Sequence, residues 1–216
     1  MSRKKRIAVF ISGSGTNMEA IVRACEDGYI PADVVVVVSN NPDAYGLVRA
    51  KNHGIPTVVV DHRQFKDRVE HEKEIIRRLK EFEPIDLVCL AGYMRVVTPY
   101  LIDYFYNEEL GLPGVINIHP ADTRAYQGTH GYEFALGLIP NSRRLARTWI
   151  TVHFVDAGVD TGPIIKQAPV DVLPDDTLET LRERGLKVEH KLYPEVVKLY
   201  VEGRLKLEDG KVKILE

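Results

Sequence analysis

The sequence contains few of the residues that cross-link small proteins or bind metal ions. Among 216 residues there are only two cysteines, and neither a CxxC nor an HExxH pattern occurs. Cys25 lies in an apolar helical stripe and Cys89 in an apolar strand run, so we expect two buried thiols and no disulfide framework, as in a reducing cytosol. Without either motif, a structural or catalytic metal is not expected.

Long apolar runs and an excess of one charge are also missing. The longest apolar candidate, Val34 to Val38, has the length of a strand, far below the roughly 18 residues of a membrane span, and no signal peptide is recognisable. The formal net charge of −2 argues against a nucleic-acid binder. We therefore expect a cytoplasmic protein, a monomer or homodimer, with no membrane or nucleic-acid partner. The basic run from Arg3 to Arg6 is interpreted as a solubilising lead-in to the first strand, with a phosphate-facing or nucleic-acid-binding role as the alternative.

Apolar runs alternate with amphipathic segments through the first half of the chain. They predict strands at 7–11, 34–38, 57–60, 87–91 and 115–118, and helices at 17–27, 44–53 and 67–82, with a short helix capped by Thr98. Strands alternating with helices predict an α/β fold with a doubly wound, mostly parallel sheet.

The second half changes character. A helix is expected at 132–138, two strands that could pair antiparallel at 147–155 and 163–172, and a long helix at 177–203. Asp176 and Glu179 resemble a capping box, while Gly185 and Pro194 predict a weakened or kinked helix. The Asp209-Gly210 turn predicts a closing hairpin. We expect one domain over 1–216, with an α/β half at 1–105, a second half at 106–203 and the hairpin at 204–216.

The first strand leads into a glycine-rich turn, Ser12-Gly13-Ser14-Gly15-Thr16-Asn17, that opens a helix. Two glycines allow a tight turn, and the free N–H groups of the helix start create an anion site. Met18 stands where a dinucleotide fingerprint has its third glycine, and no Gly-Lys-Ser/Thr run marks a P-loop. The turn therefore suits a single phosphate; the alternative is a turn without a ligand.

Asn117 and His119 stand two residues apart at the end of the fifth strand, so both should face the same way. An amide donor beside an imidazole suits acyl transfer, because the amide can bind an oxyanion and the imidazole can move protons. Asp160, in the turn 155–163, could orient His119 and keep it protonated. Asp156 is the rival carboxylate, and His153 is either a pocket residue or an ordinary strand histidine.

Four segments together resemble the folate-dependent glycinamide ribonucleotide formyltransferases of purine synthesis. They are 11–17, Leu90-Ala91-Gly92-Tyr93-Met94-Arg95, Asn117-Ile118-His119-Pro120, and 152–165, and the similarity spans about residues 6–203. The resemblance implies a Rossmann-like formyltransferase fold and two small-molecule substrates, 10-formyltetrahydrofolate and glycinamide ribonucleotide.

The resemblance also implies a role for each matching residue. Asn117, His119 and Asp160 match the catalytic trio, and Glu189 matches a residue that binds the glycinamide group. The ribonucleotide phosphate would contact Gly13, Gly15, Thr16 and Asn17. The folate would contact Arg68, Met94, Arg95, Val96, Val97, Asn117, Asp156, Ala157, Gly158, Val159 and Asp160.

One loop departs from the family pattern. After Asn-x-His-Pro the family continues Ser-Leu-Leu-Pro, whereas this chain has the polar run Ala121 to Gln127, in which Asp122 and Arg124 could pair. Leu186 stands where a glutamine is expected, and the segment 107–114 is longer than expected. Two alternatives therefore stay open: a paralogue that formylates another amine, and a non-catalytic sensor of folate or of a phosphate ligand.

Overall fold

A seven-stranded sheet forms the centre of the protein in the computed structural model, which describes residues 3–216. The strand order is β3-β2-β1-β4-β5-β6-β7. β1 to β5 run parallel, whereas β6 and β7 are antiparallel to their neighbours. This confirms the expected doubly wound, mostly parallel sheet. The bounds are β1 Lys5–Ile11, β2 Ala32–Ser39, β3 Thr57–Val59, β4 Leu87–Leu90, β5 Val115–His119, β6 Arg147–Phe154 and β7 Ile164–Asp171.

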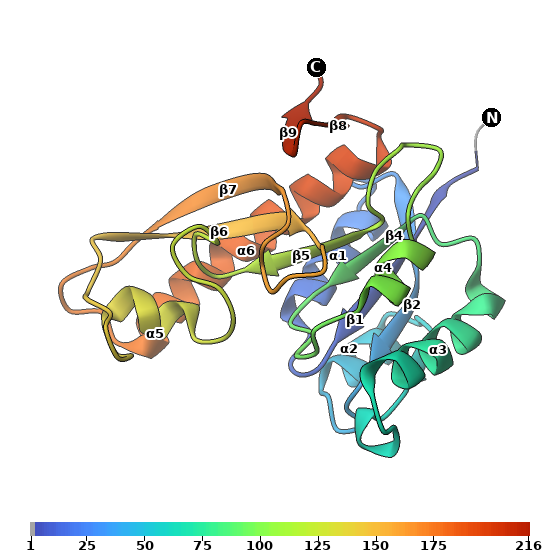
Figure 1. Ribbon diagram of the computed structural model, residues 1–216, viewed down its shortest axis with the longest axis horizontal. Helices are drawn as coiled ribbons and strands as arrows, with labels where there is room; N and C mark the ends of the chain where they lie inside the picture. Colours follow the sequence, from blue (N-terminus) through green and yellow to red (C-terminus); the bar gives the residue numbers. More distant parts are fainter. Residues whose placement is uncertain (1–2) are drawn as a thin grey trace.

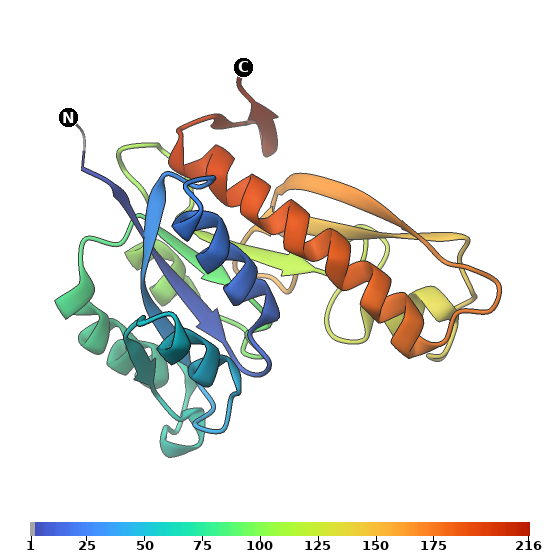
Figure 2. The ribbon, with the colours of Figure 1, turned by 180° about the vertical axis from the view of Figure 1, so that it is seen from behind.

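Helices cover both faces of this sheet. α1 and α6 lie side by side on one face (Figure 2), and α3 and α4 lie on the other (Figure 1). Because strand side chains alternate, Ile7 and Val9 of β1 join the core under α1 and α6, while Ala8 and Phe10 pack towards α3 and α4. The helical bounds are α1 Thr16–Glu26, α2 Gly46–Asn52, α3 Arg68–Leu79, α4 Pro99–Tyr104, α5 Gly131–Leu136 and α6 Leu178–Val201, with 3₁₀ turns at His62–Gln64 and Lys80–Phe82.

α6 runs without interruption through Gly185 and Pro194, where a weak point or kink was expected. Both residues are buried, and packing of the helix against α1 and the sheet offsets their poor helix propensity. The predicted capping box was wrong in its residues: Thr177 is the N-cap and exchanges hydrogen bonds with Thr180. The carboxylate of Asp176 instead accepts from Arg184 at 2.6 and 2.8 Å.

Thr98 precedes α4 as expected, but its side chain does not cap that helix. Its hydroxyl donates to the buried carboxylate of Glu72, and its backbone N–H donates to the same group at 2.7 Å. A partner 26 residues earlier in the chain has therefore displaced the local cap.

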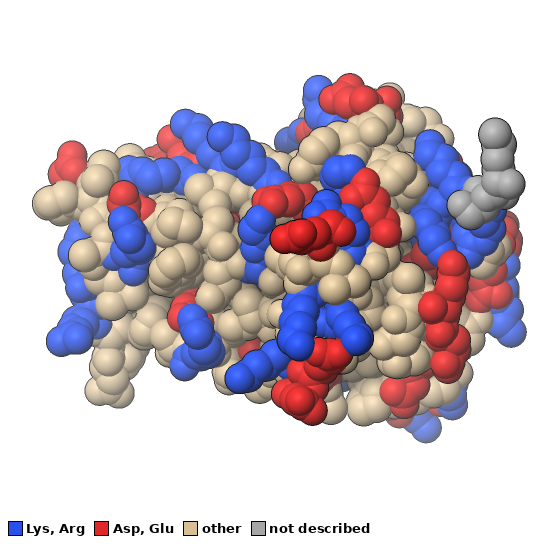
Figure 3. Space-filling view, turned by 90° about the horizontal axis from the view of Figure 1, so that it is seen from above, with Lys and Arg blue, Asp and Glu red and all other residues tan. Residues whose placement is uncertain are grey.

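The basic run at the start of β1 has a structural role. Arg3 forms a two-pronged pair with Asp86 at 2.7 Å, Lys4 pairs with Asp33, and Lys5 pairs with Glu109. These contacts tie residues 3–5 to neighbouring segments, in keeping with a lead-in to the first strand. On the surface drawn in Figure 3, basic and acidic side chains are likewise interspersed.

The chain ends in the predicted hairpin, β8 Leu205–Glu208 paired with β9 Lys211–Ile214. Asp209 and Gly210 both have positive φ in its turn, as a two-residue hairpin requires. None of the helices in residues 3–216 is long and apolar enough to cross a bilayer.

Candidate active site

A cavity of about 580 Å³ opens at the carboxyl ends of β1, β4 and β5. The strand order reverses between β1 and β4, and in open α/β sheets this switch point is where ligands bind. The cavity walls come from five segments, namely 12–17, 90–97, 117–120, 128–133 and 153–160, together with four side chains of α6: Leu178, Arg182, Leu186 and Glu189. The fold therefore brings segments from the whole length of the chain to one place.

The glycine-rich turn forms one end of this cavity. Gly15 precedes α1 with φ +73°, and an added Cβ would lie 2.6 Å from the Cα of Gly46 at the start of α2. Among the described residues no side chain caps α1, so its first N–H groups are left to a ligand or water. The turn therefore has the backbone geometry of an anion site.

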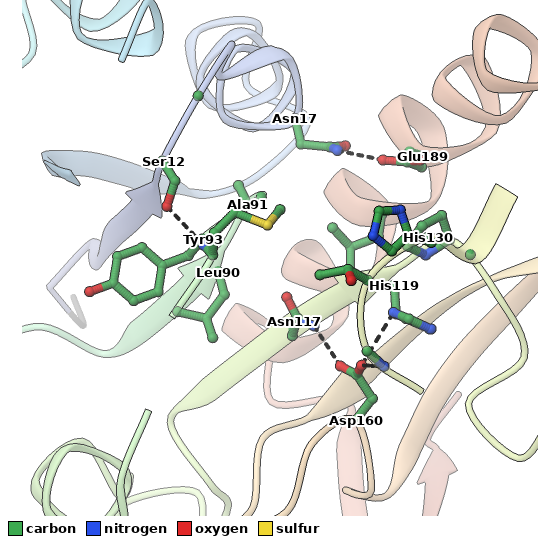
Figure 4. Close-up of a pocket in the computed structure, with 18 of the residues that line it drawn as sticks. Ser12, Asn17, Leu90, Ala91, Tyr93, Asn117, His119, His130, Asp160 and Glu189 are labelled. Carbon is green, nitrogen blue, oxygen red and sulfur yellow. Dashed lines mark hydrogen bonds and ion pairs between the residues drawn. The ribbon is translucent and has the colours of Figure 1, made fainter. Parts of the chain in front are cut away.

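The three predicted catalytic residues meet in the middle of the cavity (Figure 4). His119 Nδ1 lies 3.4 Å from Asp160 Oδ2, and the Nδ2 of Asn117 lies 3.3 Å from Asp160 Oδ1. The backbone N–H of Gly128 donates to Asp160 Oδ2 at 2.8 Å. Residues 43 positions apart thus form one connected polar group.

His153 completes the group and is a pocket residue. It pairs with Asn117 across β5 and β6, and its Nε2 lies 3.3 Å from Asn117 Nδ2 and 3.4 Å from Asp160 Oδ1. Its Nδ1 donates to the carbonyl of Phe154 at 2.7 Å. A neutral His153 therefore offers Nε2 as an acceptor to Asn117, and a protonated one donates to Asp160.

His119 is buried with an acceptor beside each ring nitrogen. Its Nε2 contacts the carbonyl of Tyr126 at 3.0 Å, so both ring nitrogens face acceptors. Burial lowers the pKa of His119 below its usual value, and the charge of Asp160 only partly opposes this effect. Asp160 favours the protonated ring, as expected, but burial is the larger influence on this pKa. When both ring nitrogens of His119 are protonated, one can donate to the Tyr126 carbonyl and the other to Asp160.

Asp160 is held ionised in a strained conformation. Burial alone would raise the pKa of Asp160, but His153, His119 and the Gly128 N–H outweigh burial and leave the pKa below its usual range. Its φ of +52° is left-handed, which is uncommon for a residue with a side chain. Such strain concentrates at functional sites.

Asn117 uses its amide within this group. Its Nδ2 is shared between Asp160 and His153, both at 3.3 Å. These contacts are long for hydrogen bonds, so exchanging one for a substrate oxygen costs little.

Most of the expected folate residues line the cavity. Met94, Arg95, Val96 and Val97 form one wall, and Met94 is 67% exposed, which leaves its side chain available to a ligand. The turn supplies Asp156, Gly158, Val159 and Asp160. Asp156 points away from His119, because its Oδ1 accepts from Gly158 and Thr161 within the turn. Two expected residues, Arg68 at the start of α3 and Ala157, do not line the cavity.

Glu189 faces the cavity from α6, between the glycine-rich turn at 12–17 and α5. The Nδ2 of Asn17 donates to its Oε2 at 2.6 Å, and the hydroxyl of Tyr132 donates to its Oε1 at 2.5 Å. The side chain of Asn17 is therefore engaged with Glu189. The sequence had offered no reason to select Tyr132.

The divergent loop is a well-connected structure. Asp122 and Arg124 pair as expected, with contacts of 2.9 Å, and Gln167 joins both residues to Thr151. The hydroxyl of Thr151 also donates to the carbonyl of Ala121 at 2.6 Å. This polar cluster leads the chain to Tyr126, whose carbonyl contacts His119, and to Gly128, whose N–H donates to Asp160. Over residues 3–216 no group of three or more side chains is arranged to hold a metal ion.

An amide, an imidazole and a carboxylate beside an anion-binding turn define a site for acyl transfer to a phosphorylated substrate. Residues 5–197 match the family described as formyl transferase, and the chain belongs to this family.

Comparison with individual proteins narrows the class. The chain is 40% identical to phosphoribosylglycinamide formyltransferase of Haemophilus influenzae, over 95% of this chain and 92% of that protein. It is 42% identical to the trifunctional purine biosynthetic protein adenosine-3 of Drosophila melanogaster, but spans only 14% of that longer protein. The crystal structure of glycinamide ribonucleotide transformylase 1 from Symbiobacterium toebii superposes with a TM-score of 0.91 at 42% identity, covering 100% of this chain and 96% of that one.

Proposed function

We propose that this protein transfers the formyl group of 10-formyltetrahydrofolate to the amine of glycinamide ribonucleotide, a step of purine biosynthesis. The turn at 13–17 binds the phosphate of the ribonucleotide, and Glu189 receives its amine end. The walls formed by residues 94–97 and 156–160 hold the folate, whose tail extends towards Arg68. Residues 1–105 thus supply the phosphate site and the folate wall at 94–97, and 106–203 supply the catalytic residues and the folate wall at 156–160.

Three groups carry the chemistry. The substrate amine attacks the formyl carbon, and the carbonyl oxygen becomes an oxyanion that the Asn117 amide and His119 stabilise. His119 accepts the proton that the attacking amine nitrogen loses, and the carboxylate of Asp160 offsets the resulting positive charge. The proton then moves to N10 of the folate as the C–N bond breaks. Holding both substrates in one cavity supplies much of the rate gain.

The observation that carries this proposal is the convergence of Asn117, His119 and Asp160 beside the phosphate turn. Purified protein should form deformylated folate from 10-formyltetrahydrofolate only when glycinamide ribonucleotide is present. His119→Ala should reduce turnover by a factor of about 10² or more while both substrates still bind. Wild-type turnover in that variant would remove His119 from the mechanism.

A second acceptor class is the specific alternative, because Leu186 and the loop 121–127 both depart from the family pattern. Turnover on another amine, with none on glycinamide ribonucleotide, would identify a paralogue. Folate binding without turnover on any amine would instead support a sensor.

A further inference from the structure

Two donors hold the carboxylate of Glu189 before any substrate arrives. The side chain is 6% exposed, and Asn17 and Tyr132 each donate to a different oxygen. Figure 4 shows the bond from Asn17 on α1 to Glu189 on α6. An ionised carboxylate only accepts hydrogen bonds, so each oxygen keeps one lone-pair direction for a ligand.

Tyr132 can reach Glu189 only because residue 185 is a glycine. A Cβ at Gly185 would lie 2.1 Å from the hydroxyl oxygen of Tyr132 and 2.5 Å from two of its ring carbons. Real Cβ atoms do not approach other atoms this closely, so any side chain at 185 displaces the ring. The tyrosine on α5 and the glycine on α6 therefore form a matched pair.

Asn17 adds an acceptor of its own. Because Glu189 needs a donor, the Nδ2 of Asn17 faces the carboxylate and its Oδ1 faces elsewhere. This Oδ1 is buried and has no hydrogen-bond partner among residues 3–216, although Asn17 lines the cavity. A buried acceptor without a donor is costly, and a ligand N–H would satisfy it. This part of the wall thus presents acceptors to a ligand that carries N–H groups.

We propose that Tyr132, seated over Gly185, is a positioning residue that fixes Glu189 for recognition of the amine-bearing end of the acceptor, with Asn17 as its counterpart. The inference rests on the proposed function and deepens it. Tyr132 sets the affinity and orientation of the amine substrate, and it has no part in binding folate or in moving protons at His119.

Tyr132→Phe tests this assignment, because the ring still fills the space over Gly185 and only the hydroxyl is lost. We expect the KM for glycinamide ribonucleotide to rise about tenfold or more, as for loss of a hydrogen bond to a charged group. The kcat and the KM for the folate should stay within about twofold. Gly185→Ala should reproduce the effect by displacing the ring.

Tyr193→Phe is the matched control. Tyr193 is also buried, but its hydroxyl donates to the carbonyls of Leu90 and Ile116 at 2.8 and 3.2 Å. This variant should lower the melting temperature without changing the KM for the ribonucleotide.

Each outcome separates the inference from the proposed function. Wild-type turnover with an unchanged KM in both Tyr132→Phe and Gly185→Ala overturns the inference alone. Equal losses in kcat and in both KM values indicate a general structural role and also overturn it. Failure of wild-type protein both to bind glycinamide ribonucleotide by calorimetry and to turn it over overturns the proposed function, and the inference with it. If Tyr132→Phe does not fold, Gly185→Ala gives the same decision.

Discussion

Removing the charge of Asp160 while keeping its shape tests the catalytic group most directly. Asp160→Asn preserves the acceptor for the Gly128 N–H, which donates at 2.8 Å. Asparagine also tolerates a left-handed backbone, so the φ of +52° adds little strain to the variant. The change therefore removes the negative charge beside His119, and it also replaces the Oδ1 that accepts from Asn117 with an NH2 group.

The structure sets the size of the expected effect. Opposite unit charges 3.4 Å apart, the separation of His119 Nδ1 and Asp160 Oδ2, interact by about 5 kcal/mol at an effective dielectric constant of about 20. This gross figure is an upper bound, because the asparagine oxygen can still accept a hydrogen bond from a protonated His119. A loss of about 2–4 kcal/mol in the transition state corresponds to a decrease in kcat of about 30- to 1,000-fold.

Release of deformylated folate, followed by absorbance at saturating concentrations of both substrates, measures this kcat. Asp156→Asn is the control, because that carboxylate lies in the same turn and accepts hydrogen bonds from Gly158 and Thr161. Since Asp156 belongs to the proposed folate wall, only its kcat at saturating folate serves as the comparison. The control should retain kcat within about threefold. An Asp160→Asn enzyme with wild-type kcat would show that the charge does not assist His119.

Three further predictions concern stability. Gly15→Ala should lower the free energy of unfolding, measured by urea titration, by about 2 kcal/mol more than Gly28→Ala. Both glycines have positive φ, but only at Gly15 would the new methyl group meet backbone atoms. Equal losses in the two variants would refute this explanation. Thr151→Val should lower the free energy of unfolding by about 1–3 kcal/mol, because its buried hydroxyl holds the loop 121–127. Truncation of the exposed Arg124 side chain to alanine should leave the urea midpoint unchanged. A larger loss from the Arg124 change than from Thr151→Val would contradict this role of the polar cluster. Burial lowers the pKa of His71 below 6.5, so the unfolded chain binds a proton at this residue more readily than the folded one. The free energy of unfolding should therefore fall as the pH drops through 6.5, and His71→Gln should reduce this fall. An identical pH dependence in the variant would contradict the prediction.

Local patterns in the sequence predicted most of the secondary structure. Apolar runs and turn residues placed the strands to within a few residues, and the Asp209-Gly210 turn located the hairpin. The spacing of Asn117 and His119 gave their common face, because strand periodicity needs no tertiary information.

Contacts between distant segments were not predictable in the same way. Thr98 is the N-cap residue of α4 as predicted, but its side chain binds Glu72 and not the helix backbone. The cap at Asp176 was misassigned, because Thr177 is the N-cap and Arg184 binds the Asp176 carboxylate. His153 could not be selected without the antiparallel register that sets it opposite Asn117. Likewise, the sequence does not report how deeply His119 is buried, which is the largest influence on its pKa.

The hydrogen bond between Asn17 and Glu189 joins positions 172 residues apart, and this separation has a consequence during synthesis of the chain itself. During translation residues 12–17 leave the ribosome before α6. A nascent chain that has not reached α6 lacks Glu189, and with it the partner of Asn17. Under the proposed function, a chain arrested before α6 would contain Asn117, His119 and Asp160 but would lack the carboxylate that receives the amine.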